Sequence, residues 1–174
     1  MTADSWSLRL AHIDDADYLP AIERAAGQLL AGEPDLAAID FNDVLSAKEQ
    51  RGFIAKGHCL VACAGEDIVG FLASQPFGRE LHIWEMSVLP AFQQRGIGAG
   101  LLRACIIDAK NSGFAAVTLT TFRDIAWNAP FYEKIGFATI SDLAAHPRLA
   151  KKIAHEASQG LPRDRRCAMI CFTG

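Results

Sequence analysis

A segment punctuated by glycines, Gly96-Ile97-Gly98-Ala99-Gly100, follows an apolar stretch and opens an amphipathic run that continues to about Asn111. The pattern predicts a strand, a turn and then a helix whose first backbone N–H groups lack acceptors. Glycines at positions 96, 98 and 100 would leave these donors uncovered, and the positive end of the helix dipole favours an anion there. The segment therefore predicts a cradle for a phosphate group, with a plain strand-to-helix connection as the alternative.

A carboxylate stands on the strand that leads into this turn. The apolar residues Leu81 and Ile83 are two positions apart, but Met86 comes three positions after Ile83, so strict alternation fails. Such a break is typical of a β-bulge, which would leave unpaired backbone groups beside Glu85. The alternative is that Trp84 and Met86 share a face of the sheet that is covered on both sides. Either neighbour would help to desolvate the Glu85 carboxyl group and raise its pKa, as suits a general base.

Composition limits the classes of protein to which the chain can belong. With 174 residues, 51% of them hydrophobic, we expect one domain over residues 1–174. A formal charge of −3 argues against nucleic acid as a partner. The chain has no apolar run of roughly 20 residues and no signal-peptide pattern, so we expect no membrane association and a cytoplasmic location. The five cysteines lack C-x-x-C spacing and predict reduced core residues and no metal site.

Hydrophobic periodicity predicts the elements that position these residues. Strands are expected over residues 6–13, 58–64, 68–77, 80–89, 115–122, 137–140 and 167–172. Helices are expected over residues 14–26, 36–51, 97–111, 127–135 and 146–158, with residues 27–34 as a loop near a ligand or a break between helices. This order predicts an α/β fold of the α+β kind, in which helices cover the faces of a mixed sheet.

The element order, with VLPAFQQRGIGAGLL after the fourth strand and WNAPFYEKIGF after the fifth, resembles the GCN5-related N-acetyltransferase (GNAT) superfamily over about residues 8–172. The resemblance implies a GNAT-like fold, with a central mixed, mostly antiparallel sheet of about seven strands, and acetyl-CoA-dependent N-acetyltransferase activity. The family's central motif corresponds to residues 93–98, whose backbone amides would hold the pyrophosphate of acetyl-CoA. The cofactor-binding residues that we assign on this basis are Met86, Ser87, Val88, Gln93, Gln94, Arg95, Gly96, Ile97, Gly98, Ala99, Asn128 and Phe131.

The second motif, residues 131–137, resembles the family's short helix and its exit into the next strand. Tyr132 occupies the position whose hydroxyl often lies near the sulfur of CoA, and would protonate the leaving thiolate. An ordinary half-buried helix tyrosine is the alternative. Many relatives carry an asparagine two turns earlier, where this chain has Ile125, while its own Asn128 lies one turn earlier and would serve the pantetheine arm.

Acetyl transfer to an amine needs a neutral nucleophile, yet a lysine-like amine with a pKa of about 10.4 is almost wholly protonated at neutral pH. Glu85 is our candidate for the general base, His82 is the second, and ordered water is a third route. Backbone N–H groups freed near Val88 where the strands splay would stabilise the oxyanion. Both reactants would be bound together, so we expect direct transfer in a ternary complex without an acyl-enzyme.

Two other functions use the same glycine-rich segment. A dinucleotide-binding oxidoreductase would need a third glycine at position 101, which is Leu. A non-catalytic acyl-CoA-binding or sensing module would keep the cradle but acetylate nothing. The acceptor stays open among small amines, amino acids, antibiotics and protein N-termini, and a homodimer is one option for assembly. Acidic residues between positions 14 and 43 favour a cationic amine or form a solvated face, and Arg163, Arg165 and Arg166 could meet a carboxylate or the ribose phosphate of CoA.

Overall fold

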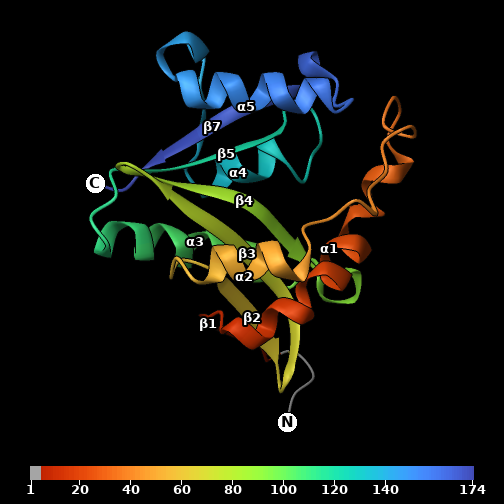
Figure 1. Ribbon diagram of the computed structural model, residues 1–174, viewed down its shortest axis with the longest axis vertical. Coiled ribbons are helices and arrows are strands. Elements are labelled where there is room, and N and C mark those ends of the chain that lie inside the picture. Colours follow the sequence, from red (N-terminus) through yellow and green to blue (C-terminus); the bar gives the residue numbers. More distant parts are fainter. Residues whose placement is uncertain (1–4) are drawn as a thin grey trace.

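The computed structural model describes residues 5–174 and is built around one seven-stranded sheet (Figure 1). Its spatial order is β1-β2-β3-β4-β5-β7-β6, in which β4 and β5 are parallel and every other pair is antiparallel. This confirms the mixed, mostly antiparallel sheet that we expected. The strands are β1 (Ser7–Leu10), β2 (Leu60–Ala64), β3 (Asp67–Phe77), β4 (Glu80–Val88), β5 (Ala116–Phe122), β6 (Ala138–Thr139) and β7 (Arg166–Phe172).

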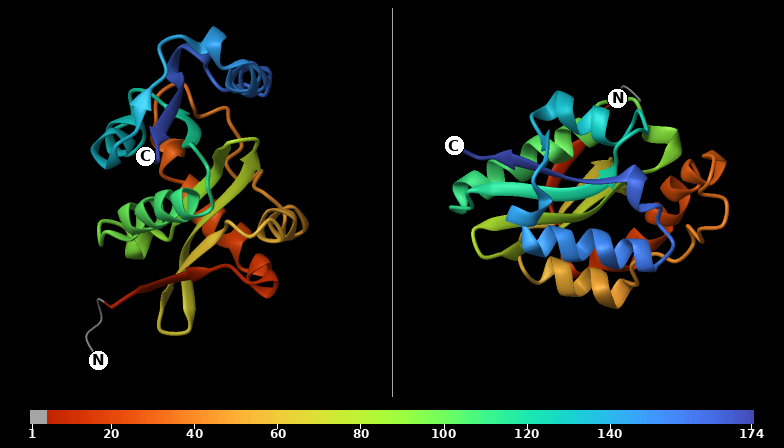
Figure 2. Two further views of the ribbon diagram at one scale, coloured as in Figure 1. Left: turned by 90° about the vertical axis from the view of Figure 1, so that its left-hand side faces the viewer. Right: turned by 90° about the horizontal axis from the view of Figure 1, so that it is seen from above.

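Helices cover both faces of this sheet, α3 and α4 on one and α1, α2 and α5 on the other (Figure 2). In the described chain, no helix is long and apolar enough to span a bilayer. The α-helices are α1 (Leu19–Gly27), α2 (Ala47–Ile54), α3 (Ile97–Asn111), α4 (Ala129–Ile135) and α5 (Pro147–Ser158). Short 3-10 turns are η1 (Ile13–Asp17), η2 (Leu30–Gly32), η3 (Pro90–Phe92), η4 (Leu143–Ala145) and η5 (Arg163–Arg165).

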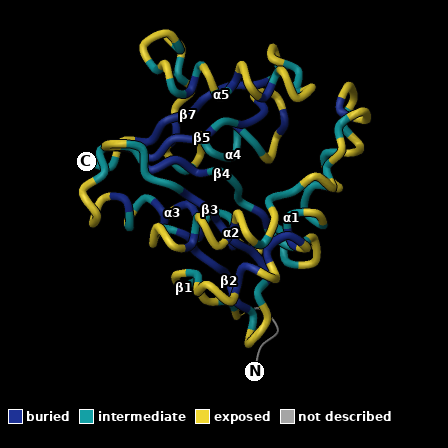
Figure 3. Tube along the Cα trace, in the orientation of Figure 1, coloured by how far each residue is buried: buried dark blue, intermediate teal, exposed yellow. Residues whose placement is uncertain are grey.

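The main hydrophobic core lies between the sheet and α3. Leu101 and Leu102 of α3 are fully buried against strand residues such as Leu72 and Leu81. Each such side chain contributes roughly 1.5–3 kcal/mol by leaving water. Figure 3 shows this core as buried strands with exposed turns around them. All five cysteines are free and buried, which confirms their prediction as reduced core residues.

The helix predicted over residues 36–51 is wrong in its first part. Helix α2 begins only after Ser46, whose hydroxyl accepts a hydrogen bond from the Glu49 amide at 3.3 Å while the Glu49 carboxylate accepts from the Ser46 amide at 2.8 Å. This capping box sets the start of the helix. The preceding segment is a loop, and its buried Leu36 packs with Phe122 and Ile125 at the end of β5. The apolar spacing therefore came from loop anchors instead of a helix face.

Strand β4 carries the bulge that its sequence predicted. Ala73 of β3 pairs with Glu85, but the next residue, Ser74, pairs with Ile83, so Trp84 is the extra residue. On its other edge, β4 pairs with β5 only from Glu80 to His82. Beyond His82 the two parallel strands are no longer paired, and this gap positions the site described below.

Candidate active site

The turn before α3 has the geometry of an anion cradle. Gly96 precedes the helix in the left-handed conformation, with φ of 80°, and Gln94 is also left-handed, with φ of 61°. The first intrahelical bond runs from the Gly100 amide to the Gly96 carbonyl at 2.9 Å. The N–H groups of residues 97–99 therefore have no partner within the helix, as at any helix start. The predicted uncovered donor at Gly100 is wrong, because the Gly100 amide is bonded within the helix.

Gly98 lies beside two other predicted cofactor residues. A Cβ built on Gly98 would lie 3.6 Å from Cζ of Phe131 and 3.7 Å from Cε of Met86. The missing side chain therefore leaves space between β4 and α4, beside the first turn of α3. Gly100 has a different neighbour, since its Cβ would lie 2.6 Å from the Trp6 ring.

Several other predicted cofactor residues brace the loop or belong to the core. The side-chain amide of Gln93 donates to the Val88 carbonyl at 3.0 Å, and the Arg95 guanidinium lies 5.0 Å from the centre of the Phe92 ring. Ile97 is 1% exposed and packs in the core, so only its backbone can face a ligand.

Asn128 stands just before α4, at its N-cap position. Its side-chain oxygen accepts a hydrogen bond of 2.6 Å from the hydroxyl of Thr121 on β5. Its oxygen is therefore already bonded within the protein. Ile125, which stands where many relatives have asparagine, is buried against the loop that follows α1.

Glu85 lies on the face of β4 that is opposite α3. Burial raises the pKa of its carboxyl group, and the hydrogen bonds from the Ser87 hydroxyl, at 2.7 Å, and from the Met86 backbone oppose this effect. A raised pKa brings a carboxyl group closer to the range of an effective general base. The structure directs the Ser87 hydroxyl to Glu85, so we reassign this side chain from the cofactor to the candidate base.

The backbone at the end of β4 faces the gap between the strands. The Leu89 amide donates to the Val69 carbonyl of β3 at 2.8 Å. Because successive residues of a strand direct their peptide groups to alternate edges, the Val88 N–H points toward the β5 side. Strand β5 no longer pairs with β4 at this level. This N–H group is therefore placed to bind an oxygen atom in the gap.

Tyr132 on α4 is half-buried, and its ring packs edge-to-face against Phe131 and Phe137. Burial raises the pKa of its hydroxyl, and the negative charge of Glu85 raises it further. The phenol therefore stays protonated at neutral pH. It lies close enough to Glu85 for the negative charge of that carboxylate to act on its hydroxyl.

His82 does not suit the role of a base. Burial, with the nearby charges of Arg148 and Lys152, lowers the pKa of His82 to about 2. Its Nδ1 lies 2.9 Å from the hydroxyl of Thr118, and Trp84 covers the ring edge-on. The imidazole is a core group that would not hold a proton at neutral pH.

A cavity of about 330 Å³ opens beside Glu85, and its wall is acidic. Burial raises the pKa of Glu23 on α1 to about 8, and the charge of Glu85 adds to this shift. Among the residues described, no basic side chain lines this cavity. Its lining residues are Glu23, Asp43, Val44, Leu45, Glu49, Trp84 and Glu85.

Sequence reasoning missed Glu23 and Glu49, because each lies on a helix far from β4 along the chain. The acidic residues between positions 14 and 43, which the sequence analysis singled out, contribute Asp43 to the cavity. The sequence feature that could have pointed to Glu23 was its position on α1 next to the buried residue Ile22. For Glu49 the only signal was its part in the capping box.

Comparison with known proteins identifies the family. Residues 55–139 match the model of the acetyltransferase (GNAT) domain. The N-alpha-acetyltransferase RimI of Mycobacterium tuberculosis is 31% identical over 141 residues, which cover 80% of this chain and 84% of that protein. The chain belongs to the GNAT family.

A further relative and a solved structure are also acetyltransferases. A mycothiol acetyltransferase of Propionibacterium freudenreichii is 26% identical over 91% of the chain, and the chain spans only 52% of that protein's length. The crystal structure of the PaiA N-acetyltransferase from Thermoplasma acidophilum, in complex with coenzyme A, superposes with a TM-score of 0.72 at 16% identity, covering 97% of this chain and 99% of that one. At that identity the superposition shows the shared fold.

The arginines at the start of β7 meet carboxylates of this GNAT chain itself. Arg165 pairs with Asp124 at 2.9 Å and with Glu33 at 3.5 Å, and buried Arg166 pairs with Glu156 at 3.1 Å. Arg165 therefore ties η5 to the loop after α1. Arg165 and Arg166 are therefore paired within the protein.

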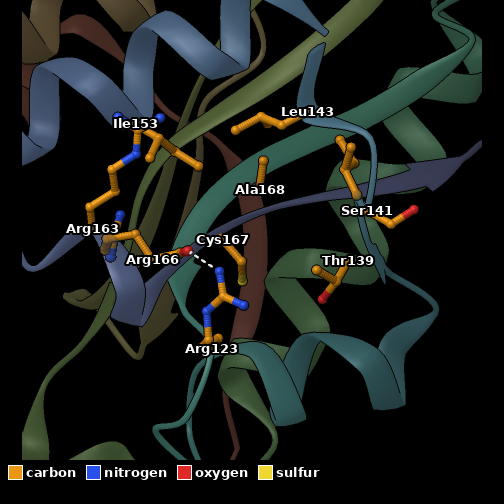
Figure 4. Close-up of a pocket in the computed structure, with 10 residues that line it drawn as sticks. Arg123, Thr139, Ser141, Leu143, Ile153, Arg163, Arg166, Cys167 and Ala168 are labelled. Carbon is orange, nitrogen blue, oxygen red and sulfur yellow. Dashed lines mark hydrogen bonds between the residues drawn. The ribbon is translucent and has the colours of Figure 1, made fainter. Parts of the chain in front are cut away.

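A second cavity, of about 400 Å³, lies between β7 and α5. Figure 4 shows that the Arg123 side chain turns back onto β7, where it donates to the Arg166 carbonyl at 2.7 Å, while Arg163 extends along α5. The arginines do not converge on one point. This cavity therefore lacks converging charged groups, and the gap between β4 and β5 is the candidate site.

Proposed function

We propose that this GNAT chain transfers an acetyl group from acetyl-CoA directly to a primary amine within a ternary complex. The observation that carries the proposal is the position of Glu85, a half-buried carboxyl group of raised pKa beside the point where β4 leaves β5. An uncovered helix start opens on the same gap from one side, and an acidic cavity from the other.

Acetyl-CoA would bind with its pyrophosphate at the start of α3. The free amides of residues 97–99 and the helix dipole both favour the negative charge. The pantetheine arm would then follow the space between Met86 and Phe131 toward the gap. This path brings the thioester to the end of β4, where Val88 and Tyr132 lie.

The chemistry follows from the groups at the gap. The acceptor amine forms a bond to the thioester carbon while Glu85 accepts the proton that the nitrogen loses. The Val88 N–H stabilises the negative charge that develops on the carbonyl oxygen. The carbon–sulfur bond then breaks, and Tyr132 donates its proton to the departing thiolate. The products are the acetylated amine and CoA.

The acidic cavity supports a positively charged acceptor. A cation that enters it would meet the carboxyl groups of Glu23, Glu49 and Glu85, and its charge would favour the ionised form of Glu23, whose pKa burial raises to about 8; no basic side chain of the described residues lines the cavity. Opposite charges a few ångströms apart, partly shielded from water, attract strongly. We therefore infer an acceptor whose reacting amine lies at Glu85 and whose second cationic group is held by Glu23 and Glu49.

Release of CoA with a panel of amines tests this function. We expect diaminobutane to give a higher kcat/KM than butylamine, because only the diamine keeps a positive charge when one nitrogen is neutral. Glu23→Gln should raise KM for the diamine and leave KM for butylamine nearly unchanged. Binding of acetyl-CoA without CoA release from any amine would instead support the non-catalytic acyl-CoA-binding module.

A further inference from the structure

We propose that Trp6 is a positioning residue that orients the phosphate-binding turn; the proposal rests on the donor site inferred above. Trp6 directly precedes β1, far from the turn along the chain. Its indole Nε1 donates a hydrogen bond to the Arg95 carbonyl at 3.1 Å, across a separation of 89 residues. No sequence motif connects the two positions, and neither neighbour of Trp6 carries a comparable side chain.

The bond determines the direction of one amide in the cradle. The peptide between Arg95 and Gly96 is trans, so its carbonyl and its N–H point in opposite directions. When Trp6 holds the Arg95 carbonyl on one side, the Gly96 N–H must point away from Trp6. The same bond keeps the carbonyl oxygen, which would repel a phosphate, on the Trp6 side of the turn. Trp6 therefore turns a donor, not an acceptor, toward the anion.

Gly100 is the position that admits the indole. A Cβ on Gly100 would lie 2.6 Å from Cη2 and 3.1 Å from Cζ3 of Trp6, closer than real Cβ atoms approach a ring. Glycine is a poor helix former, and at this position its own amide is already bonded within the helix. The absence of a side chain at position 100 is thus explained by Trp6 and not by the ligand.

The turn needs such support because its backbone is strained. Gln94 is a non-glycine residue with φ of 61°, a conformation that persists where surrounding contacts impose it. Gln93 holds the near side of the turn through the Val88 carbonyl at 3.0 Å, and Trp6 holds the far side through Arg95. Two fixed points organise the cradle before the ligand arrives, which reduces the cost of binding.

Trp6→Phe removes the indole N–H and keeps an aromatic ring beside Gly100. We expect the Kd for acetyl-CoA, measured by calorimetry, to rise about fivefold, as for the loss of one hydrogen bond. S-acetylpantetheine, which lacks the pyrophosphate, is the matched control, and its Kd, measured in the same way, should not change. An equal loss with both donors, or no loss with either, would overturn the proposal, because a general structural defect would not distinguish them.

Gly100→Ala provides a second variant if Trp6→Phe folds poorly. Its methyl group should displace the indole and weaken acetyl-CoA binding in the parent, but should have no such effect in a Trp6→Ala background, where the space is empty. Additive effects in this double-mutant cycle would refute the contact. Calorimetry decides these outcomes even if no amine is acetylated, so a failure of the proposed catalysis is distinguishable from a failure of the Trp6 proposal. Absence of acetyl-CoA binding in the parent would overturn both.

Discussion

Glu85→Gln is the sharpest test of the proposed mechanism. Glutamine keeps the size of the side chain and can still accept the hydrogen bond from the Ser87 hydroxyl. It cannot accept a proton from the substrate. The variant therefore removes proton transfer while it changes the packing around Trp84 and the bulge very little.

The size of the effect follows from the protonation of the amine. An amine with a pKa of about 10.4 is neutral in roughly one molecule in 2,500 at pH 7. A positioned general base contributes about 10²- to 10⁴-fold, so we expect kcat/KM to fall at least about 10²-fold. In the parent, the rate should be flat above the raised pKa of Glu85 and below that of the amine. In the variant, it should rise about tenfold per pH unit as free amine accumulates.

Initial rates of CoA release across this pH range measure both profiles, with Glu23→Gln as a control that removes a carboxylate from the same cavity. The control should change KM and keep the flat profile. Parallel profiles with equal rates in the parent and Glu85→Gln would refute the reasoning. Proton removal would then go through water, because buried His82 has a pKa of about 2.

Four further outcomes are expected. Tyr132→Phe should lower kcat and leave the Kd for acetyl-CoA nearly unchanged, since the hydroxyl acts on the leaving thiolate; an unchanged kcat under conditions where chemistry limits the rate would assign it a structural role. Gly98→Val should lose most of the Tm increase that acetyl-CoA produces, because its side chain would fill the space beside Phe131 and Met86; full retention would mean that the cradle lies elsewhere. Ser87→Ala removes a hydrogen bond that lowers the pKa of Glu85, so the acid limb of the rate profile should move to higher pH. The pKa of Glu23 rises from 4.5 to about 8 on folding, so the folded state retains a proton that the unfolded state loses, and stability should fall as pH rises through this range; Tm measured against pH should lack this decline in Glu23→Gln.

Features that depend on near neighbours were predictable from the amino-acid order. The 97–111 helix, the hairpin of β2 and β3, and the bulge before Glu85 each leave a local pattern of apolar spacing or turn residues. The loop over residues 36–45 was not predictable in this way. Its apolar residues are spaced as on a helix, but they pack on the end of β5, and that contact exists only in the folded chain.

The candidate site also combines features that the sequence predicts with features that depend on tertiary contacts. The sequence by itself predicted the glycine-rich turn and Glu85 as candidates, since their residue types and spacing within single elements carry the signal, and Tyr132 was a candidate through the family resemblance of its motif. Only the tertiary structure decided that Glu23 and Glu85 line one acidic cavity, that His82 is a buried neutral group, and that Trp6 donates a hydrogen bond to the turn before α3. Burial and electric charge act through space, so the pKa of a side chain and the direction of an amide depend on groups that chain order does not bring together.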